Sequence, residues 1–251
     1  VLFGASPALC RSFLAGQPDT FQAFDANTLY EPYATSLRMS DVGYKNKAQA
    51  GLAVSYNDLD SYVRSLGAAT RTADPEYVAI GTQVDGVWRQ LNTSILQIEN
   101  EYYSFVRPKA VARSGEAPSC ALKRAGVEYV EVRALDLDPY APTGVSERAL
   151  RFIEILLLFC LLEDSPDISD HELRRINHNQ GLVARMGRQP GLELRRGDVS
   201  QVPLRSWALE VLDALSGPAG LLDEGRSGTP YADALVDCRE RIRNPECTPS
   251  G

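Results

Sequence analysis

The sequence predicts an α+β protein in which sheet strands come first and helices follow. Up to Tyr140, loop-forming residues surround short segments in which apolar and polar side chains alternate, the period of a strand. After Tyr140 the apolar residues recur at helical spacing. Segregated elements of this kind are typical of the α+β class. We expect binding loops and sheet strands over residues 1–140 and mainly helices over residues 141–251.

The composition is that of an ordinary soluble protein. The chain has 251 residues, 44% of them hydrophobic, which is enough for one large domain or two small ones. Its net charge of −7 argues against binding nucleic acid through a broad basic surface. The longest apolar run, Ile155–Leu162, is far shorter than the roughly 20 residues that span a bilayer, so we expect no membrane contact. No signal peptide is visible, and both ends resemble cuts through a longer protein.

The cysteines argue against a zinc site and against a disulfide framework. Their number is odd, they are scattered, and no two form a CxxC pair. This usage fits a reducing compartment, and we expect the protein in the cytoplasm. The five cysteines are Cys10, Cys120, Cys160, Cys238 and Cys247.

The first third of the chain is irregular. Residues 16–51 are dense in Pro, Gly, Asp, Asn and Tyr, and a loop of this length is more often a binding loop than a passive connection. Its tyrosines, Tyr30, Tyr33 and Tyr44, are also compatible with aromatic residues at the edge of the core. The loop is followed by a helix that we expect Asn57 to cap and Gly67 to end.

Alternation predicts two strands, Ile95–Phe105 and Val127–Leu137. If they share a sheet, their polar faces form one concave surface. That surface would carry Gln97, Glu99, Tyr103, Glu131 and Arg133. Carboxylates beside a guanidinium suit a magnesium–nucleotide site, because Mg²⁺ prefers oxygen ligands and the planar arginine fork matches phosphate oxygens.

A second interpretation of these charges stays open. Glu and Arg on strands commonly form cross-strand ion pairs on a solvated face. The cations Arg107, Lys109 and Arg113, which lie in a predicted basic loop, are equally compatible with solvated charges. His171 and His178 are expected at the surface of a helix.

Capping residues place four helices in the second half. The predicted starts and ends are as follows: Ser146 to about Glu163, stopping at Ser165–Pro166; residues 170–185, with Ser169 and Glu172 as a capping box; residues 203–217, ending at Gly217–Pro218; and Thr229–Pro230 to Asn244–Pro245.

Several long strings carry a more specific signal. In order, they are "LFGASPALCRSFL", "YEPYATSLRMSDVGYKNKAQ", "LQIENEYYSFVRPK", "RSGEAPSCALKRAGVEYVEVRALDLDPY" and "GVSERALRFIEILLLFCLLEDSP". Together they closely resemble glutamate–cysteine ligase of the proteobacterial type. The resemblance covers nearly the whole chain and is strongest from Leu2 to about Pro190.

The resemblance implies a curved antiparallel sheet of the glutamine-synthetase-like kind, with helices packed on its convex side, incomplete in this chain. Its concave face would bind ATP, Mg²⁺ (or Mn²⁺) and the amino acids. The implied reaction joins the γ-carboxyl of L-glutamate to the amine of L-cysteine through γ-glutamyl phosphate, the first step of glutathione biosynthesis. We expect the whole protein to be a monomer, with these small molecules as partners.

The resemblance also assigns roles to residues. Glu131 matches a metal-ligand glutamate, and Arg133 matches the catalytic arginine that faces the transferred phosphoryl group of ATP. Arg107 and Lys109 match residues that could contact phosphate. Three further residues are implied in substrate binding: Tyr44 and Tyr103, which match tyrosines of the cysteine pocket, and Arg38.

The family pattern includes acidic metal ligands in a segment before residue 1 and further chain after residue 251. The resemblance therefore implies a partial catalytic domain with little or no ligase activity by itself, and with exposed sheet edges that favour aggregation. Two alternatives remain. One is a non-catalytic fragment or pseudoenzyme that binds amino acid or nucleotide, and the other is a related carboxylate–amine ligase with a different amine acceptor.

Overall fold

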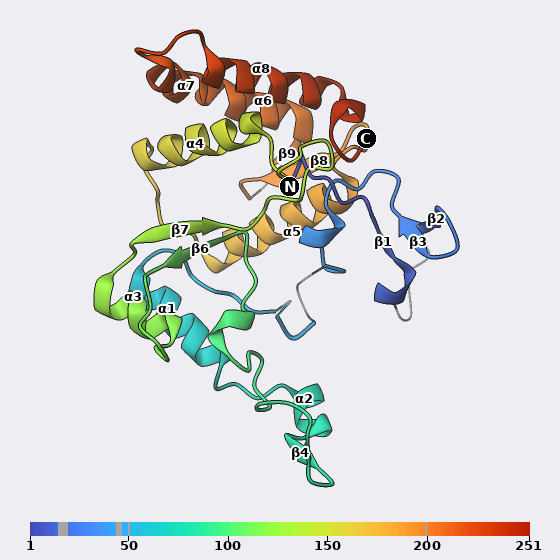
Figure 1. Cartoon of the computed structure of the whole chain (residues 1–251), viewed down its shortest axis with the longest axis vertical. Coiled ribbons are helices and arrows are strands. Elements are labelled where there is room, and N and C mark those ends of the chain that lie inside the picture. The colour runs from blue at the N-terminus through green and yellow to red at the C-terminus, as the bar shows by residue number, and fades with distance from the viewer. Residues whose placement is uncertain (15–19, 44–46, 50, 199) are drawn as a thin grey trace. The chain divides into compact units, whose positions relative to one another are not determined.

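The computed structural model describes the chain except for residues 15–19, 44–46, 50 and 199 (Figure 1). The chain divides into two units. The first comprises Val1–Ser40, Leu135–Pro166 and Arg174–Gly251, and the second comprises Asp41–Ala134 and Asp167–Leu173. Helices accompany small antiparallel sheets, so the α+β class is confirmed. In the described part of the chain, no helix has both the length and the apolar character needed to cross a membrane.

The first unit is mainly helical. Its elements are β1 (Ala8–Cys10), β2 (Gln22–Ala23), β3 (Thr28–Tyr30), α4 (Glu147–Leu162), the part of α5 (Asp170–Met186) from residue 174 on, β8 (Glu193–Arg196), β9 (Ser200–Pro203), α6 (Leu204–Ala214), α7 (Ser216–Asp223) and α8 (Pro230–Arg243). Helix α8 packs against α4, α6 and α7, as Figure 1 shows. Ile155, Leu212 and Leu235 lie in the core between these helices.

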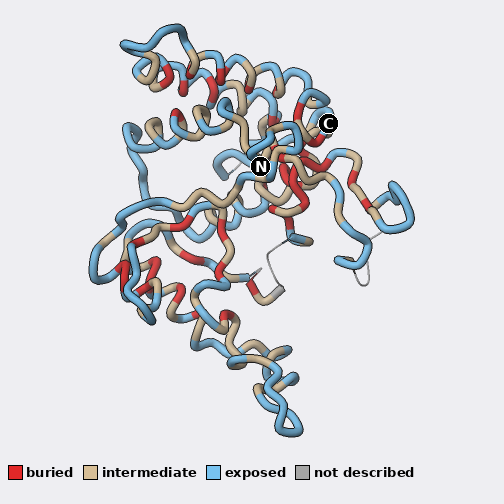
Figure 2. Tube along the Cα trace, in the orientation of Figure 1, coloured by how far each residue is buried: buried red, intermediate tan, exposed pale blue. Residues whose placement is uncertain are grey.

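The second unit surrounds a smaller core. Its elements are α1 (Leu59–Ala69), α2 (Pro75–Ile80), β4 (Gln83–Val84), β5 (Val87–Trp88), β6 (Val106–Lys109), α3 (Pro118–Ala125) and β7 (Tyr129–Val132). Tyr62, Leu66 and Leu122 belong to its buried cluster, which joins α1 to α3. Figure 2 shows no buried residue over α2, β4 and β5, so this part of the unit is held by turns and hydrogen bonds.

The predicted helices of the second half are confirmed. Ser146 accepts a hydrogen bond from the Ala149 amide at 3.2 Å at the start of α4. The Ser169 hydroxyl accepts one from the Glu172 amide at 3.2 Å at the start of α5. Helix α6 ends at Ala214, earlier than expected, because Gly217–Pro218 lies in the first turn of α7, where proline is tolerated.

The predicted limits of the helix after the first loop are wrong. Asp58, rather than Asn57, caps α1 by accepting a hydrogen bond from the Ser61 amide at 2.7 Å. Asn57 instead bonds the main chain of Ile168 in both directions. Gly67 lies inside α1, where it leaves room for the Arg71 side chain packed next to it.

The predicted strand Ile95–Phe105 is also wrong. This segment contains a 3₁₀ turn at Glu99–Glu101. Main-chain amides here donate to side-chain oxygens instead of to a neighbouring strand. The Gln97 amide donates to the Glu101 carboxylate at 2.7 Å, and the Leu91 amide donates to Gln97 Oε1 at 2.8 Å. The strand lies later, at β6, in what the sequence presented as a basic loop.

The second predicted strand, Val127–Leu137, is confirmed only over β7. Helix α3 and the β8–β9 hairpin were not predicted, although α3 carries readable signals. Pro118 stands at its first turn, and Gly126, with φ +78°, ends it.

Candidate active site

The strands β6 and β7 form an antiparallel pair that places charged residues opposite one another. Arg107 is paired with Glu131, and Lys109 with Tyr129. Directly opposite residues point to the same face of a sheet, so these four side chains share one face, which we call the polar face. Arg133 continues it, because its amide donates to the Phe105 carbonyl at 2.8 Å just beyond the last ladder pair.

The polar face is buried at one end, which inverts the usual pattern of a surface sheet. Arg107 is only 4% exposed, whereas Val106 and Val130 on the opposite face are 40% and 48% exposed. An antiparallel sheet with one solvated face normally turns its apolar side chains inward. Arg107 is therefore not a solvated charge. Burying a guanidinium costs free energy unless another group compensates its lost hydration. Arg113, by contrast, is exposed, as expected for a solvated charge.

Two buried polar atoms on this face lack partners. Arg107 Nε and Glu131 Oε2 are both shielded from solvent, and neither has a hydrogen-bond partner among the residues that the structure describes. A buried donor and a buried acceptor without partners each lose the hydration they had in water. They stand at directly opposed positions of the ladder, so a donor and a carboxylate acceptor are available to a ligand at one place.

Arg133 and Tyr103 are in contact. The Arg133 Cζ lies 4.9 Å from the centroid of the Tyr103 ring, the distance of a cation–π pair. Gln49 fixes the segment that carries Tyr103: its Oε1 accepts from the Tyr103 amide at 3.2 Å, and its Nε2 donates to the Glu101 carbonyl at 3.0 Å. Gln49 thus fixes the main chain of Tyr103, and the ring contacts the Arg133 guanidinium.

Three tyrosines lie around the start of β6. The Tyr56 hydroxyl donates to the Val106 carbonyl at 3.0 Å and lies 3.3 Å from the Tyr102 hydroxyl. Tyr62 packs beside Tyr56, with ring centroids 5.4 Å apart. Burial raises the pKa of Tyr62 to about 12, and the neighbouring Arg107 guanidinium acts in the opposite direction. Burial likewise raises the pKa of Tyr102.

Arg38 belongs to the first unit, where it forms an ion pair with Asp136. Arg38 Nε lies 2.7 Å from Asp136 Oδ1, and Nη2 donates to the Leu135 carbonyl at 2.7 Å. The Ala5 amide and the Ser6 hydroxyl donate to the other carboxylate oxygen at 2.9 and 2.8 Å. Burial opposes ionisation of this carboxyl, but the hydrogen bonds outweigh it, and the pKa of Asp136 is lowered.

The predicted site residues therefore fall into three groups. The second unit brings five of them together: Tyr103, Arg107, Lys109, Glu131 and Arg133. Arg38 lies in the first unit, and Tyr44 falls outside the described residues. His171 and His178 are exposed, as expected.

Gln97 and Glu99, which we expected on the concave surface, make other contacts. Gln97 is bonded within its own turn. The Glu99 carboxylate accepts from the Ser119 amide at 2.8 Å and from the Ser119 hydroxyl, which caps the N-terminus of α3. The described residues contain no group of three or more His, Cys, Asp or Glu placed to hold a metal ion.

Sequence reasoning missed Gln49, Tyr62 and Asp136. The apolar spacing around Tyr62 indicates burial within a helix, but nothing in it identifies Arg107 as its neighbour. Asp136 follows Arg133 by three residues, and its partner Arg38 is distant in the chain.

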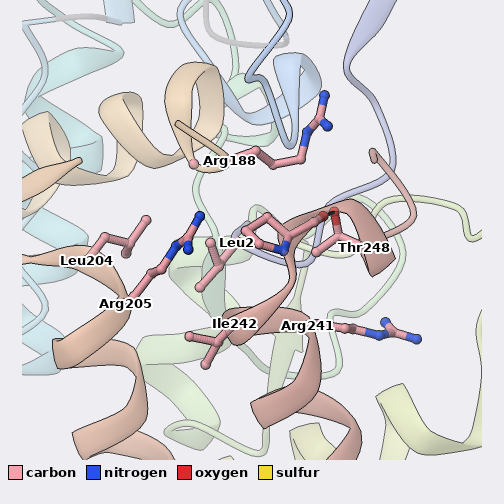
Figure 3. A pocket seen from close by; sticks show the side chains of 9 residues that line it. Leu2, Arg188, Leu204, Arg205, Arg241, Ile242 and Thr248 are labelled. Atoms are coloured by element: carbon pink, nitrogen blue, oxygen red, sulfur yellow. Dashed lines mark hydrogen bonds between the residues drawn. The ribbon is translucent and has the colours of Figure 1, made fainter. Parts of the chain in front are cut away.

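The first unit contains a small pocket that none of the predicted site residues lines (Figure 3). In Figure 3 the guanidinium groups of Arg188 and Arg241 point away from Leu2. Arg188 is paired with Glu246 at 3.1 Å and Arg241 with Asp237 at 3.1 Å, so these charges are already balanced. The pocket is lined by Leu2, Gly187, Arg188, Leu204, Arg205, Arg241, Ile242, Pro245 and Thr248.

Comparisons with solved structures identify the fold. The chain matches a crystal structure of glutamate–cysteine ligase from Francisella tularensis in complex with AMP, with a TM-score of 0.90, 40% identity, and coverage of 99% of this chain and 49% of that one. A bifunctional glutathione synthetase from Pasteurella multocida shares the fold, with a TM-score of 0.65, 21% identity, and coverage of 100% of this chain and 26% of that one.

Sequence comparisons agree with this result. The chain is 51% identical over 249 residues to glutamate–cysteine ligase from Pseudomonas entomophila (strain L48), covering 99% of this chain and 47% of the relative. It is 52% identical over 249 residues to that from Azotobacter vinelandii (strain DJ / ATCC BAA-1303), with the same coverage. The chain thus spans about half the length of these relatives. A family model described as glutamate-cysteine ligase matches residues 1–183. The chain belongs to the glutamate–cysteine ligase family.

Proposed function

We propose that the chain forms part of the catalytic domain of an ATP-dependent ligase. The reaction joins the γ-carboxyl of L-glutamate to the amine of L-cysteine, the first step of glutathione biosynthesis, in a monomeric cytoplasmic protein. Membership of the family supports the reaction, and the complex of the Francisella relative with AMP supports nucleotide use. The pair β6–β7 would be one part of a curved antiparallel sheet with helices on its convex side.

The observation that carries the proposal is the pair of unpartnered buried atoms on the polar face, Arg107 Nε and Glu131 Oε2. A ligand that satisfies both must present an acceptor to the guanidinium and a donor or a cation to the carboxylate, and the opposite charges of the two groups favour an anionic oxygen at the first and a positive charge at the second. A phosphate group accompanied by a divalent cation has both features. Lys109 and Arg133 on the same face add positive charge that suits several phosphate oxygens.

Mg²⁺ or Mn²⁺ fits the residue that would hold it. Glu131 offers a shielded carboxylate oxygen without a protein partner, and oxygen is the ligand type that these hard cations prefer. When bound, the metal would offset negative charge on the phosphate groups. Glu131 is one ligand, and a complete coordination shell needs several oxygens.

Each cation of the polar face would have its own role in the reaction. A carboxylate is a poor acyl donor, so its oxygen takes the γ-phosphoryl group of ATP, which releases ADP and leaves an acyl phosphate. The cysteine amine then attacks the acyl carbon, phosphate leaves, and the amine gives up a proton as the amide forms. Arg133 would face the phosphoryl group as it moves between two anions, where a fixed guanidinium lowers the barrier because it needs no reorientation. Arg107 and Lys109 would hold the remaining phosphate oxygens.

Substrate recognition falls to the aromatic residues and to Arg38. Tyr103 and Tyr44 would form walls of the cysteine pocket and select a small side chain by shape, which separates a thiol from a hydroxyl only modestly. Arg38 would bind substrate, and its ion pair with Asp136 fixes the direction of its guanidinium. Fixed geometry matters in both steps because the reacting groups must be aligned in line.

Turnover tests the proposal. In a ligase that contains this chain, we expect Glu131→Gln and Arg133→Lys each to lower kcat for ATP- and cysteine-dependent phosphate release by about a hundredfold or more. Arg113→Lys, which changes an exposed cation outside the polar face, serves as the control and should leave kcat unchanged. Normal turnover in both site variants would refute the assignment.

The chain by itself gives a second test. With one carboxylate on the polar face, we expect little or no phosphate release by the purified 251-residue chain. Turnover close to that of a full-length relative would contradict this expectation. An active ligase that accepts other amines better than cysteine would favour the related ligase with another acceptor. Nucleotide binding without turnover in the whole protein would favour a pseudoenzyme.

A further inference from the structure

Gln49 joins two segments of the second unit that are distant along the chain. It ends the 3₁₀ turn Lys47–Gln49, and it is buried although its side chain is polar. Its Oε1 accepts a hydrogen bond from the Tyr103 amide at 3.2 Å, and its Nε2 donates to the Glu101 carbonyl at 3.0 Å. The side chain thus bonds one main-chain donor and one main-chain acceptor, as a neighbouring strand would.

The chemistry of these two contacts fixes the orientation of the Gln49 side-chain amide. The Tyr103 amide can only donate, so it faces the oxygen Oε1, and the Glu101 carbonyl can only accept, so it faces Nε2. A methionine or a glutamate at this position would have a similar length but would lack one or both of these groups. Either replacement would leave at least one main-chain group without its partner.

The main chain of Gln49 is itself attached to the core of the second unit. Its carbonyl accepts a hydrogen bond from the Leu52 amide at 3.1 Å. Leu52 packs against the buried cluster that includes Tyr62 and Leu66. Gln49 therefore connects the Tyr103 main chain to a rigid part of the unit.

Tyr102, between the two bonded main-chain groups, belongs to the same buried cluster and is 8% exposed. Its main chain is extended, with φ −62° and ψ 116°. Successive side chains of an extended chain point to opposite sides, so Tyr103 is directed away from this core. Its ring lies 4.9 Å from Arg133 Cζ. A tyrosine has few side-chain torsions, so the position of its main chain largely determines where its ring lies.

We propose that Gln49 is a positioning residue of the ligase reaction, which sets the place of the Tyr103 ring and, through the ring, that of the Arg133 guanidinium. The inference rests on the proposed function for what this ring and this guanidinium do. The hydrogen bonds and the ring contact exist without substrate. The position of the ring can therefore be tested separately from turnover.

The first experiment follows the Tyr103 ring in a ligase that contains this chain, without ligands. The protein carries ¹³C-labelled tyrosine, and the Tyr103 signal is assigned in NMR spectra by its absence in Tyr103→Phe. A guanidinium against the ring affects the chemical shift of the ring, so we expect Arg133→Met to move the signal. Gln49→Met, which keeps a flexible side chain of similar length, should move or broaden it as well.

Gln90 offers a matched control in the same unit. Its Nε2 donates to the main-chain carbonyls of Tyr77 and Gly81. Gln90→Met therefore removes main-chain hydrogen bonds by the same chemical change, but in a segment that does not carry Tyr103. We expect it to leave the Tyr103 signal in place and kcat within about twofold of the wild type.

The second experiment measures turnover in the same ligase. We expect Gln49→Met to reduce kcat for ATP- and cysteine-dependent phosphate release about five- to tenfold, no more than Tyr103→Ala, and to leave the KM of ATP within about twofold. Discrimination between cysteine and 2-aminobutyrate should fall in parallel. Added to Tyr103→Ala, Gln49→Met should cause no further loss, because a residue that acts through the ring has no effect once the ring is gone. Added to Tyr103→Phe, which keeps the ring, it should cause its full loss.

The outcomes separate this inference from the proposed function. A wild-type Tyr103 signal in Gln49→Met overturns the positioning role, whatever the kinetics show. Additive losses of Gln49→Met and Tyr103→Ala overturn it as well. A displaced signal with wild-type kcat and acceptor selectivity overturns the link between ring position and reaction. A wild-type ligase without cysteine-dependent turnover refutes the proposed function and, with it, the role of Gln49 in the reaction, while the ring signal still reports the contact.

Urea titrations of each variant identify any loss that comes from misfolding. If Gln49→Met unfolds, Gln49→Glu takes its place. This variant keeps the acceptor for the Tyr103 amide and loses the donor to the Glu101 carbonyl. The same displaced signal and the same non-additivity with Tyr103→Ala are expected, and their absence overturns the proposal.

Discussion

The guanidinium of Arg133 lies against the ring of Tyr103, its Cζ 4.9 Å from the ring centroid. The pair joins β7 to the segment before β6, and the buried Gln49 holds the tyrosine main chain in place. A residue proposed to act on phosphate is thus restrained by one proposed to select the amine. Changes at Tyr103 are expected to affect both functions.

Removing the Tyr103 ring should lower both rate and selectivity. In an active ligase that contains this chain, we expect Tyr103→Ala to reduce kcat about tenfold, because a desolvated cation–π contact contributes about 1–2 kcal/mol. Discrimination between cysteine and 2-aminobutyrate should fall as well. Tyr103→Phe keeps the ring and should retain kcat within about threefold. Equal loss in both variants would show that the hydroxyl, rather than the ring, is what matters.

Asp136 should stabilise the first unit strongly. Its carboxylate receives hydrogen bonds from Arg38, the Ala5 amide and Ser6. We expect Asp136→Asn to lower the free energy of unfolding by about 2–3 kcal/mol, because the Asp136 side chain is only 4% exposed and water cannot replace the carboxylate that its donors need. Asp213→Asn is the control: the Asp213 side chain is 74% exposed, so water can replace it as the partner of Arg239, and the variant should cost less than about 1 kcal/mol in the same urea titration. Similar costs for the two variants would contradict this account.

The contribution of Asp136 should depend on pH in a defined direction. Its pKa is lowered in the folded state, so its stabilisation is complete above the ordinary aspartate pKa of about 3.9 and is lost as the pH falls through the lower folded value. The difference in unfolding free energy between the wild type and Asp136→Asn should therefore be constant near neutral pH and shrink below about pH 4. A difference that grows on acidification would be incompatible with a lowered pKa.

Glu99 should stabilise α3 rather than bind a ligand. Its carboxylate caps the helix by accepting from the Ser119 amide and hydroxyl. We expect Glu99→Ala to lower the free energy of unfolding by about 1 kcal/mol, the usual value of a helix cap, and to leave MgATP affinity unchanged. Asp164→Ala, at an exposed position, should change stability by less than about 0.5 kcal/mol. Loss of MgATP affinity in Glu99→Ala, with an unchanged free energy of unfolding, would show that Glu99 binds the ligand.

The cysteines should differ widely in reactivity. All five are free thiols. A hydrogen bond with Ser12 lowers the pKa of the exposed Cys10, whereas burial raises the pKa of Cys238 to about 12. Because the thiolate is the reactive form, iodoacetamide at about pH 7.5 should label Cys10 first and Cys238 only after unfolding, as followed by mass spectrometry. Ser12→Ala, which removes the hydroxyl that lowers the pKa of Cys10, should slow its labelling. Labelling of Cys238 in the folded chain would contradict its burial.

The pair β6–β7 should promote self-association. Each strand pairs only with the other among the described residues, and Val106 of β6 and Val130 of β7 are exposed. Unpaired edges with apolar flanks favour pairing with another chain. We expect size-exclusion chromatography of the isolated chain to show concentration-dependent association, which Val130→Lys reduces. A clean monomer at high concentration would disprove this.

The parts of the fold that sequence predicts well are set by neighbouring residues. Ser146 and Ser169 each act on an amide three residues later, so their capping roles can be read from the sequence. The predicted strand Ile95–Phe105 is wrong because alternation does not reveal that the Glu101 carboxylate accepts from the Gln97 amide and so prevents a ladder there.

In the candidate site, too, the sequence predicts what neighbouring residues determine and does not predict what tertiary packing determines. Glu131 and Arg133 were identified, and their common face follows from alternation alone. That Arg107 stands opposite Glu131 depends on the register of two strands separated by a helix and its loops, and a register is fixed by tertiary packing. The packing of Tyr62 against Tyr56 depends in turn on how α1 packs, which periodicity does not specify.

The two tryptophans determine what an optical probe of this chain can report. Trp88 of β5 is 71% exposed in the folded state, so its emission has little reason to change on denaturation. Trp207 of α6 is partly buried and packs against an apolar cluster of the first unit, and the Arg196 Cζ lies 5.1 Å from the centroid of its ring. Tryptophan fluorescence will therefore follow the unfolding of the first unit and will change little when the unit that carries Glu131 and Arg133 unfolds.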